Sequence, residues 1–208
     1  MSATECLWAG LACIVLVVAH RPLADSIDSM SFQLFGLPVS RGIAIGRAVL
    51  VASSRLDVAE NALHRDRVDL LAVAAEEAAR VGAHVDGSRG IVVDGDERLL
   101  RRALRNLVEN GQRYGGGDLD VVLARDDAAP GGSVVKVQVC DRGPGVPAAM
   151  RERIFEPFFR LPGHAEQAGG VGLGLALVKQ IAVRHVGNVR CEARAGGGSV
   201  FVIEMPAS

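Results

Sequence analysis

The alternation of apolar and polar positions is clearest in residues 134–140, which read V-V-K-V-Q-V-C. The apolar face of this segment carries Val135, Val137 and Val139. Lys136 and Gln138 fall on the other face, and a period of two residues is typical of a half-buried strand. The strand leads to Asp141 and a Gly-Pro-Gly turn, and a second glycine cluster further on opens into an apolar helix, residues 173–185. This order of strand, acid, glycines and helix start predicts a nucleotide pocket with a lid between the glycine clusters.

The helical period marks two further segments. The longer helix begins after Asp96, and its apolar stripe comprises Leu99, Leu100, Ala103, Leu104, Leu107 and Val108. An earlier helix is predicted from Leu70 to about His84, with Asp69 as its N-cap. Short strands are predicted at residues 90–93, 119–124, 188–194 and 199–204. Antiparallel strands combined with helices predict an α+β fold, a two-layer α/β sandwich.

The chain divides into two parts of different character. Residues 68–208 carry the continuous pattern described above, whereas residues 1–60 do not. Residues 7–19 form an apolar run, but this run is shorter than the roughly 20 residues that a membrane-spanning helix needs. The residues before it include an acid instead of the basic start of a secretory signal. We therefore predict a leader without activity of its own, residues 1–60, followed by one nucleotide-binding domain, residues 68–208.

Composition adds limits on function. The apolar fraction of 49% suits a packed domain, and the formal net charge of −1 gives no electrostatic drive toward nucleic acid. The four cysteines show no C-x-x-C spacing. Cys140 and Cys191 fall within strand patterns, so we expect small buried thiols there instead of a metal or redox site. These features predict a reducing, cytoplasmic setting, and any membrane anchor is expected in segments outside this chain.

The longer helix, which reads L-L-R-R-A-L-R-N-L-V-E-N-G-Q-R-Y, places Asn106 and Asn110 on one face. Amide oxygens are hard, neutral ligands that suit Mg²⁺ held mainly by phosphates and water. The later motifs are D-x-G-x-G at 141–145, F-x-P-F-F at 155–159 and G-x-G-L-G-L at 170–175. With these motifs in this order, the second part of the chain resembles the ATP-binding domain of sensor histidine kinases, whose fold is shared with gyrase, Hsp90 and the mismatch-repair ATPases.

The resemblance implies roles for individual residues. Asn110 would be the metal ligand that joins Mg²⁺ to the phosphates, with Asn106 in support, and Glu109 would be a candidate base that polarises an acceptor histidine. Asp141 would accept a hydrogen bond from the adenine amino group. A carboxylate at this position selects adenine over guanine, because guanine presents an acceptor at that edge. The other implied ATP contacts are Arg113, Tyr114, Gly143, Gly145, Val146, Phe155, Gly170, Gly172, Leu173, Gly174 and Leu175. The implied anchor of the lid comprises Phe155, Phe158 and Phe159.

The resemblance also implies a direction for the chemistry. Asn106 stands where the hydrolysing members of the fold carry a glutamate that activates water, and an amide cannot take a proton at neutral pH. Transfer of the γ-phosphoryl group of ATP to a histidine is therefore implied, with ATP and Mg²⁺ as cofactors. Histidine kinases carry that histidine in an H-E-x-[RK]-x-P-like box, and none of the five histidines here has this context. We expect a separate histidine-bearing dimerisation domain and a response regulator as partners, no nucleic-acid partner, and no autophosphorylation by the isolated chain.

Two other functions stay open. A non-catalytic regulatory module, or a pseudokinase remnant, would bind ATP without transferring phosphate. Residues 31–60 resemble the N-terminus of enzyme I, the phosphoenolpyruvate–protein phosphotransferase, through the stretch G-L-P-V-S-R-G-I-A-I-G-R-A. That resemblance includes neither the phosphorylated histidine motif nor the phosphoenolpyruvate-binding barrel of enzyme I. Phosphorylation of the chain by phosphoenolpyruvate would support a role in that system.

Overall fold

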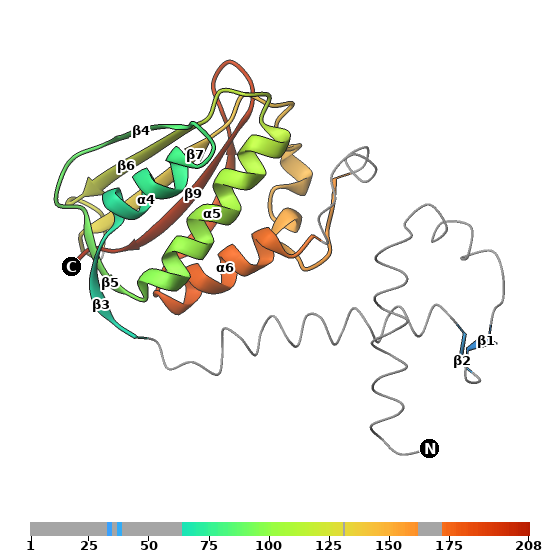
Figure 1. Cartoon of the computed structure of the whole chain (residues 1–208), viewed down its shortest axis with the longest axis horizontal. Coiled ribbons are helices and arrows are strands. Elements are labelled where there is room, and N and C mark those ends of the chain that lie inside the picture. The colour runs from blue at the N-terminus through green and yellow to red at the C-terminus, as the bar shows by residue number, and fades with distance from the viewer. Residues whose placement is uncertain (1–32, 35–36, 39–63, 131, 162–171) are drawn as a thin grey trace. The chain divides into compact units, whose positions relative to one another are not determined.

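The computed structural model describes residues 33–34, 37–38, 64–130, 132–161 and 172–208 (Figure 1). The chain forms two compact units, Met1–Ala59 and Glu60–Ser208. In the first unit the described residues form an antiparallel pair, β1 (Gln33–Leu34) and β2 (Leu37–Pro38). The other predictions for residues 1–60, including the apolar run, lie outside the described residues. Among the helices that the structure describes, none has the length and apolar character needed to cross a membrane.

The second unit is built on a five-stranded sheet with the order β4-β6-β7-β9-β8 (Figure 1). Its strands are β4 (His84–Gly87), β6 (Asp120–Asp126), β7 (Val134–Cys140), β8 (Asn188–Ala193) and β9 (Ser199–Pro206). β4 runs parallel to β6, and the other neighbouring strands are antiparallel. A separate antiparallel pair consists of β3 (Asp66–Asp69) and β5 (Val92–Gly95).

Three helices lie on one face of this sheet (Figure 1). They are α4 (Leu70–Ala79), α5 (Glu97–Tyr114) and α6 (Gly174–Arg184). Two 3₁₀ turns, η2 (Ala148–Met150) and η3 (Arg153–Phe155), precede α6. One layer of helices on one sheet is the predicted two-layer α+β sandwich, so the fold class is confirmed.

The core lies between β7 and α5. Val135, Val137 and Val139 are at most 1% exposed, and they face the apolar stripe of α5, in which Leu104 and Leu107 are at most 2% exposed. Burial of each such side chain stabilises the fold by roughly 1.5–3 kcal/mol. Leu99 is only half-buried, which places it at the edge of the predicted stripe. The strand alternation therefore sets which face of β7 the helix covers.

The first helix is shorter than predicted, and this part of the sequence-based prediction was wrong. Asp69 is its N-cap as expected, since its carboxylate accepts hydrogen bonds from the N–H groups of Leu71 and Ala72 at 3.0 and 3.2 Å. The helix ends at Ala79, and Gly82 reverses the chain with a φ of +70°. His84 then begins β4, because pairing with the distant strand β6 outweighs continuation of the helix.

The two described cysteines, Cys140 and Cys191, are buried free thiols, as the strand pattern predicts. Burial raises the pKa of the Cys191 thiol to about 11 and also raises the pKa of Cys140. Both side chains therefore act as small apolar groups in the sheet at neutral pH.

Candidate nucleotide-binding site

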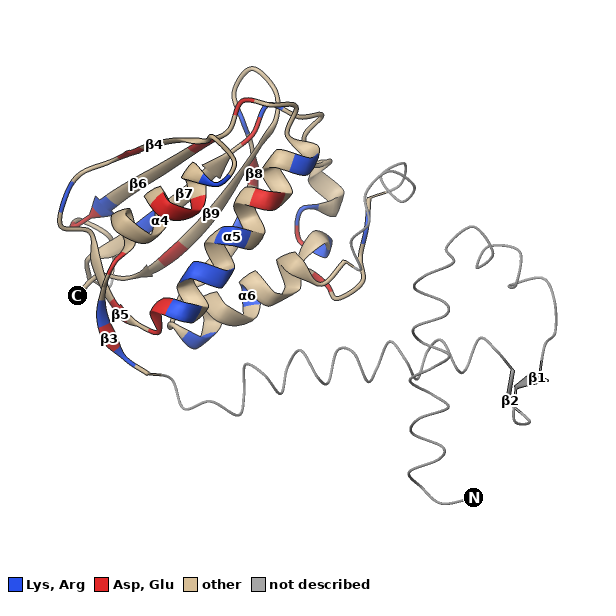
Figure 2. Cartoon of the chain, in the orientation of Figure 1, with Lys and Arg blue, Asp and Glu red and all other residues tan. Residues whose placement is uncertain are grey.

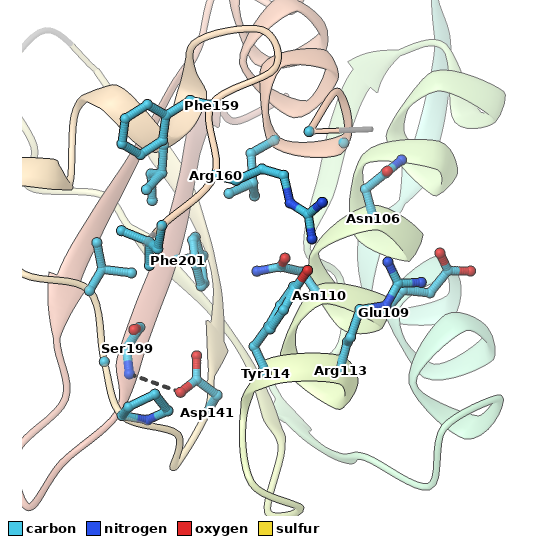
Figure 3. Close-up of a pocket in the computed structure, with 18 of the residues that line it drawn as sticks. Asn106, Glu109, Asn110, Arg113, Tyr114, Asp141, Phe159, Arg160, Ser199 and Phe201 are labelled. Atoms are coloured by element: carbon cyan, nitrogen blue, oxygen red, sulfur yellow. Dashed lines mark hydrogen bonds between the residues drawn. The ribbon is translucent and has the colours of Figure 1, made fainter. Parts of the chain in front are cut away.

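A cavity of about 350 Å³ lies beside the C-terminal half of α5 (Figure 3). Its walls are the end of α5, the loop that follows β7, the segment after η3, the start of α6 and the beginning of β9. The lining residues are Asn106, Glu109, Asn110, Arg113, Tyr114, Asp141, Pro144, Gly145, Val146, Ile154, Phe159, Arg160, Leu161, Gly172, Leu173, Gly174, Leu175, Ser199 and Phe201. The volume and the mixture of apolar walls with a few polar groups are typical of a small-molecule site.

Asp141 lies on one side of this cavity and is only 6% exposed. One carboxylate oxygen, Oδ1, accepts hydrogen bonds from the N–H groups of Gly143 at 2.9 Å and Ser199 at 3.1 Å. The other oxygen points toward the cavity (Figure 3). Because Oδ1 is already used by two backbone donors, the acid presents one oxygen to a ligand.

Two glycines allow the end of α5 to approach the acid. A Cβ atom at Gly115, the C-cap of α5, would lie 2.6 Å from the Cβ of Asp141. A Cβ atom at Gly143 would lie 2.3 Å from the carbonyl oxygen of Tyr114. Both distances are too short for any side chain, so these positions need glycine for close packing. Gly143 was predicted to contact ATP, but the structure places it behind the cavity wall, against the end of α5.

The amide pair lies across the cavity from Asp141 (Figure 3). Asn106 and Asn110 lie one helical turn apart on α5, and Glu109 lines the same wall. The side-chain N–H of Asn106 donates to the carbonyl oxygen of Arg102 at 2.7 Å. Its amide oxygen lies against the start of α6, where a Cβ atom at Gly174 would be 2.8 Å away. The first turn of α6 and this face of α5 therefore meet at the cavity.

Most of the predicted site residues line this cavity. They are Asn106, Glu109, Asn110, Arg113, Tyr114, Asp141, Gly145, Val146, Gly172, Leu173, Gly174 and Leu175. Phe155 does not line it, because this side chain is 5% exposed within the core, where η3 packs on α6. Gly170, another predicted contact, lies outside the described residues. Of the lid phenylalanines, Phe159 lines the cavity, and the guanidinium carbon of Arg153 lies 4.7 Å from its ring centre.

Several residues that line the cavity were not predicted from the sequence. They are Pro144, Ile154, Arg160, Leu161, Ser199 and Phe201. Ser199 and Phe201 begin β9, and only the pairing of β9 with β7 brings them beside Asp141. Arg160 extends from the segment after η3 toward Asn110 (Figure 3). Its position directly after the F-x-P-F-F motif was the one local signal that could have identified it.

A buried acid outside the cavity fastens α4 to α5. Glu77 is 2% exposed, and its carboxylate accepts hydrogen bonds from Nε and Nη2 of Arg105 at 2.8 and 3.0 Å. Arg101 also reaches it at 3.4 Å. The hydrogen bonds from Arg105 hold the pKa of Glu77 below its usual range. Figure 2 shows the acidic residues of α4 beside the basic residues of α5.

His185 joins the other end of α5 to α6. Its Nε2 accepts a hydrogen bond from the N–H of Asp96 at 3.0 Å, and its Nδ1 lies 2.7 Å from the carbonyl oxygen of Ile181. Burial lowers the pKa of this imidazole, so the neutral ring with a proton on Nδ1 fits both contacts. Asp96 in turn caps α5 by accepting from the N–H groups of Arg98 and Leu99.

Residues 95–208, more than half of the chain, match the family described as "Histidine kinase-, DNA gyrase B-, and HSP90-like ATPase". The chain belongs to this family. The match begins just before α5 and runs to the last residue, so it contains every described residue of the cavity. Within the family, the chain carries the catalytic ATP-binding domain of the sensor histidine kinase type, as predicted.

Relatives agree with this assignment. The sensor-like histidine kinase SenX3 of Mycolicibacterium smegmatis is 36% identical over 203 residues, which cover 91% of this chain and 52% of that protein. Sensor protein RstB of Escherichia coli is 32% identical over 196 residues, which cover 88% of this chain and 43% of RstB. The chain therefore spans about half the length of the curated relatives it matches. The SenX3 match covers more of the chain than residues 68–208 make up, so the similarity continues into the preceding residues.

Solved structures share the fold. The mycobacterial sensor histidine kinase MprB superposes with a TM-score of 0.57 at 28% identity, over 69% of this chain and 97% of that one. The ATP-binding domain of PrrB from Mycobacterium tuberculosis superposes with a TM-score of 0.54 at 27% identity, over 70% and 98% of the two chains. The comparisons give no support to the resemblance of residues 31–60 to enzyme I.

Proposed function

We propose that this chain binds Mg²⁺–ATP in the cavity and donates the γ-phosphoryl group to a histidine, as the catalytic domain of a two-component sensor histidine kinase. The observation that carries the proposal is the placement of one available carboxylate oxygen on Asp141 across a single cavity from Asn106 and Asn110. Asp141 can recognise the base of a nucleotide, while the phosphates of the same nucleotide reach Asn106 and Asn110.

The acid selects adenine through its one available oxygen. The 6-amino group of adenine donates to such an oxygen, whereas the carbonyl oxygen of guanine would place two acceptors against each other. The side chains of Val146, Ile154 and Phe201 provide apolar walls against which a purine ring can pack.

The other side of the cavity fits phosphates and a divalent ion. Asn106 and Asn110 offer neutral amide oxygens, and Glu109 adds a carboxylate. Within the part of the chain that the structure describes, no group of three or more His, Cys, Asp or Glu residues could hold a metal by itself. Few protein ligands of hard oxygen character suit Mg²⁺ that is held mainly by phosphates and water, with Asn110 as its main protein ligand. When bound, Mg²⁺ neutralises charge on the phosphates.

The side chains around the phosphates then orient the transfer. Arg160 extends over the cavity toward Asn110 and supplies positive charge where the γ-phosphate would lie. Asn106 cannot act as a base for water, which favours an acceptor other than water. Glu109 is exposed at the rim, where its carboxylate can polarise an incoming imidazole. The acceptor histidine would come from a separate dimerisation domain, and the phosphate would pass from there to a response regulator.

The test of binding is calorimetry with Mg²⁺–ATP and Mg²⁺–GTP on the wild type and on Asp141→Asn. The wild type should bind ATP at least tenfold more tightly than GTP. In Asp141→Asn the side-chain NH₂ can face the base, so ATP affinity should fall about 30-fold and the preference should shift toward GTP, whose carbonyl accepts from an amide. No heat with ATP, or equal heat with GTP, would overturn the proposal.

A non-catalytic regulatory module is the second candidate, because loss of a water-activating base at Asn106 also suits binding without chemistry. Addition of a separate histidine hairpin domain and labelled ATP distinguishes the two. An acid-labile phosphoprotein is expected for the kinase, and ATP binding without any transfer is expected for the regulatory module.

A further inference from the structure

Arg194, the residue that directly follows β8, lies behind the acid and outside the cavity. Its side chain is 17% exposed, and its Nη1 donates to the carbonyl oxygens of Cys140 at 3.2 Å and Asp141 at 3.3 Å. Its Nη2 donates to the carboxylate of Asp120. Asp120 on β6 is the direct partner of Cys140 in the sheet, so one guanidinium group joins two neighbouring strands where β7 reaches the acid.

The turn that carries Arg194 also supplies a hydrogen bond to the acid itself. The N–H of Asp141 donates to the carbonyl oxygen of Ser199 at 2.9 Å, and the N–H of Ser199 donates to Oδ1 of Asp141 at 3.1 Å. The N–H of Arg194 closes the turn by donating to the carbonyl oxygen of Gly198 at 3.1 Å. A Cβ atom at Gly198 would lie 2.0 Å from the carbonyl oxygen of Asp141, so the turn is packed directly against the backbone of the acid.

We propose that Arg194 is a positioning residue for nucleotide selection, which holds the backbone of Asp141 so that Oδ1 stays bonded to Gly143 and Ser199. This inference rests on the proposed binding of ATP. A carboxylate with both oxygens available can accept from the two adjacent N–H donors of guanine. With Oδ1 held by backbone donors, Asp141 presents a single oxygen, and that geometry suits the amino group of adenine.

Only arginine fits this position. Its planar guanidinium has several donors in a fixed arrangement, so it reaches two carbonyl oxygens and a carboxylate at once. The lysine ammonium is a single compact charge that cannot span the three acceptors in the same way. Arg190 is a matched comparison, because it is an arginine of β8, the strand that directly precedes Arg194, and pairs with Glu192 and Glu204.

The first test needs no nucleotide. Amide hydrogen exchange of Gly143 and Ser199 should accelerate about tenfold in Arg194→Gln, because their acceptor loses its fixed position. Exchange in Arg190→Gln should match the wild type. In Arg194→Lys, which retains the charge, the acceleration should be smaller than in Arg194→Gln.

The second test is the ratio of the dissociation constants for Mg²⁺–GTP and Mg²⁺–ATP. Arg194→Gln should weaken ATP binding about tenfold and reduce the preference for ATP by a similar factor. Arg190→Gln should keep the wild-type affinity for ATP and the wild-type preference for ATP. A purely structural role of Arg194 would lower the melting temperature without changing this ratio.

The outcomes separate the two proposals. If the wild type shows no preference for ATP, the proposed function and this inference both fail. If the wild type prefers ATP, and folded Arg194→Gln keeps both the wild-type amide hydrogen exchange and the wild-type ratio of dissociation constants, only the inference about Arg194 fails. Equal weakening of ATP and GTP would also overturn it. If Arg194→Gln does not fold, Asp120→Asn replaces it, because this variant keeps the arginine and removes its ion pair. A smaller change of the GTP-to-ATP ratio of dissociation constants in the same direction would support the inference. An unchanged ratio would overturn it.

Discussion

The two halves of α5 use their polar side chains in opposite ways. In the N-terminal half, Asp96 caps the helix, and Arg101 and Arg105 pair with the buried Glu77 of α4. In the C-terminal half, Asn106 and Asn110 present their side chains to the cavity instead. One helix is therefore fastened to the protein at its first turns and offers ligand-binding groups at its last. Polar groups bonded within the protein contribute stability, whereas polar groups that face a cavity contribute binding.

The largest effect should follow from Asn110→Ala in the C-terminal half. Loss of the amide that contacts the metal and phosphates should weaken Mg²⁺–ATP binding about 100-fold, while binding of ATP without Mg²⁺ should change little. Calorimetry with and without the metal measures both values.

Gln112→Ala is the matched control for this variant, because Gln112 is exposed on the same part of α5 and does not line the cavity. Its ATP affinity and its free energy of unfolding should equal those of the wild type. If Asn110→Ala weakened ATP equally with and without Mg²⁺, Asn110 would not be the metal ligand.

An intermediate effect is expected from Glu77→Ala in the N-terminal half. The change leaves Arg80, Arg101 and Arg105 without their buried partner and opens a small void between α4 and α5, so the free energy of unfolding should fall by about 2 kcal/mol. Urea unfolding measures this loss. ATP affinity measured well below the unfolding transition should stay within about twofold of the wild type.

Glu76→Ala serves as the control, because this exposed residue pairs with the same Arg101. Glu76→Ala should lower the free energy of unfolding by less than about 0.5 kcal/mol, as is typical of surface ion pairs. A large loss of ATP affinity in Glu77→Ala, with little loss of stability, would contradict the division of α5 into two halves.

The smallest effect concerns pH and His185. Burial lowers the pKa of its imidazole, and Asp96, Arg65 and Arg184 are the charged groups that act on it. The folded state therefore favours the neutral ring, so its contribution to stability is present above the unfolded pKa of about 6.5 and is lost as the pH falls below that value. Between pH 7.5 and 5.5 we expect a loss of about 1 kcal/mol in the free energy of unfolding.

His185→Gln should remove this part of the pH dependence, as measured by urea unfolding at the two pH values. His84→Gln is the control, because His84 is exposed in β4. If His84→Gln and His185→Gln reduced the pH dependence of the free energy of unfolding by the same amount, the contact between His185 and the N–H of Asp96 would not be the source of that dependence.

Local patterns predicted much of the fold, because they depend on neighbours in the chain. The alternation in β7 and the stripe of α5 identified which faces are buried, and Asp69 identified the start of α4. The end of α4 was not predictable in the same way. An apolar helical pattern ran on through Val81, and only the parallel pairing of His84–Gly87 with β6 decided that a strand follows.

Sequence motifs alone identified the family and the part of the site that lies within continuous motifs, namely the amides of α5, the acid after β7 and the glycines before α6. Periodicity and turn chemistry act over a few residues, so they can be read without coordinates. Long-range packing of the folded chain places Ser199 and Phe201 at the cavity and keeps Phe155 in the core. The same packing brings Arg194 behind Asp141 and His185 onto the N–H of Asp96. These contacts join residues that are distant in the chain, and strand order and helix packing bring them together.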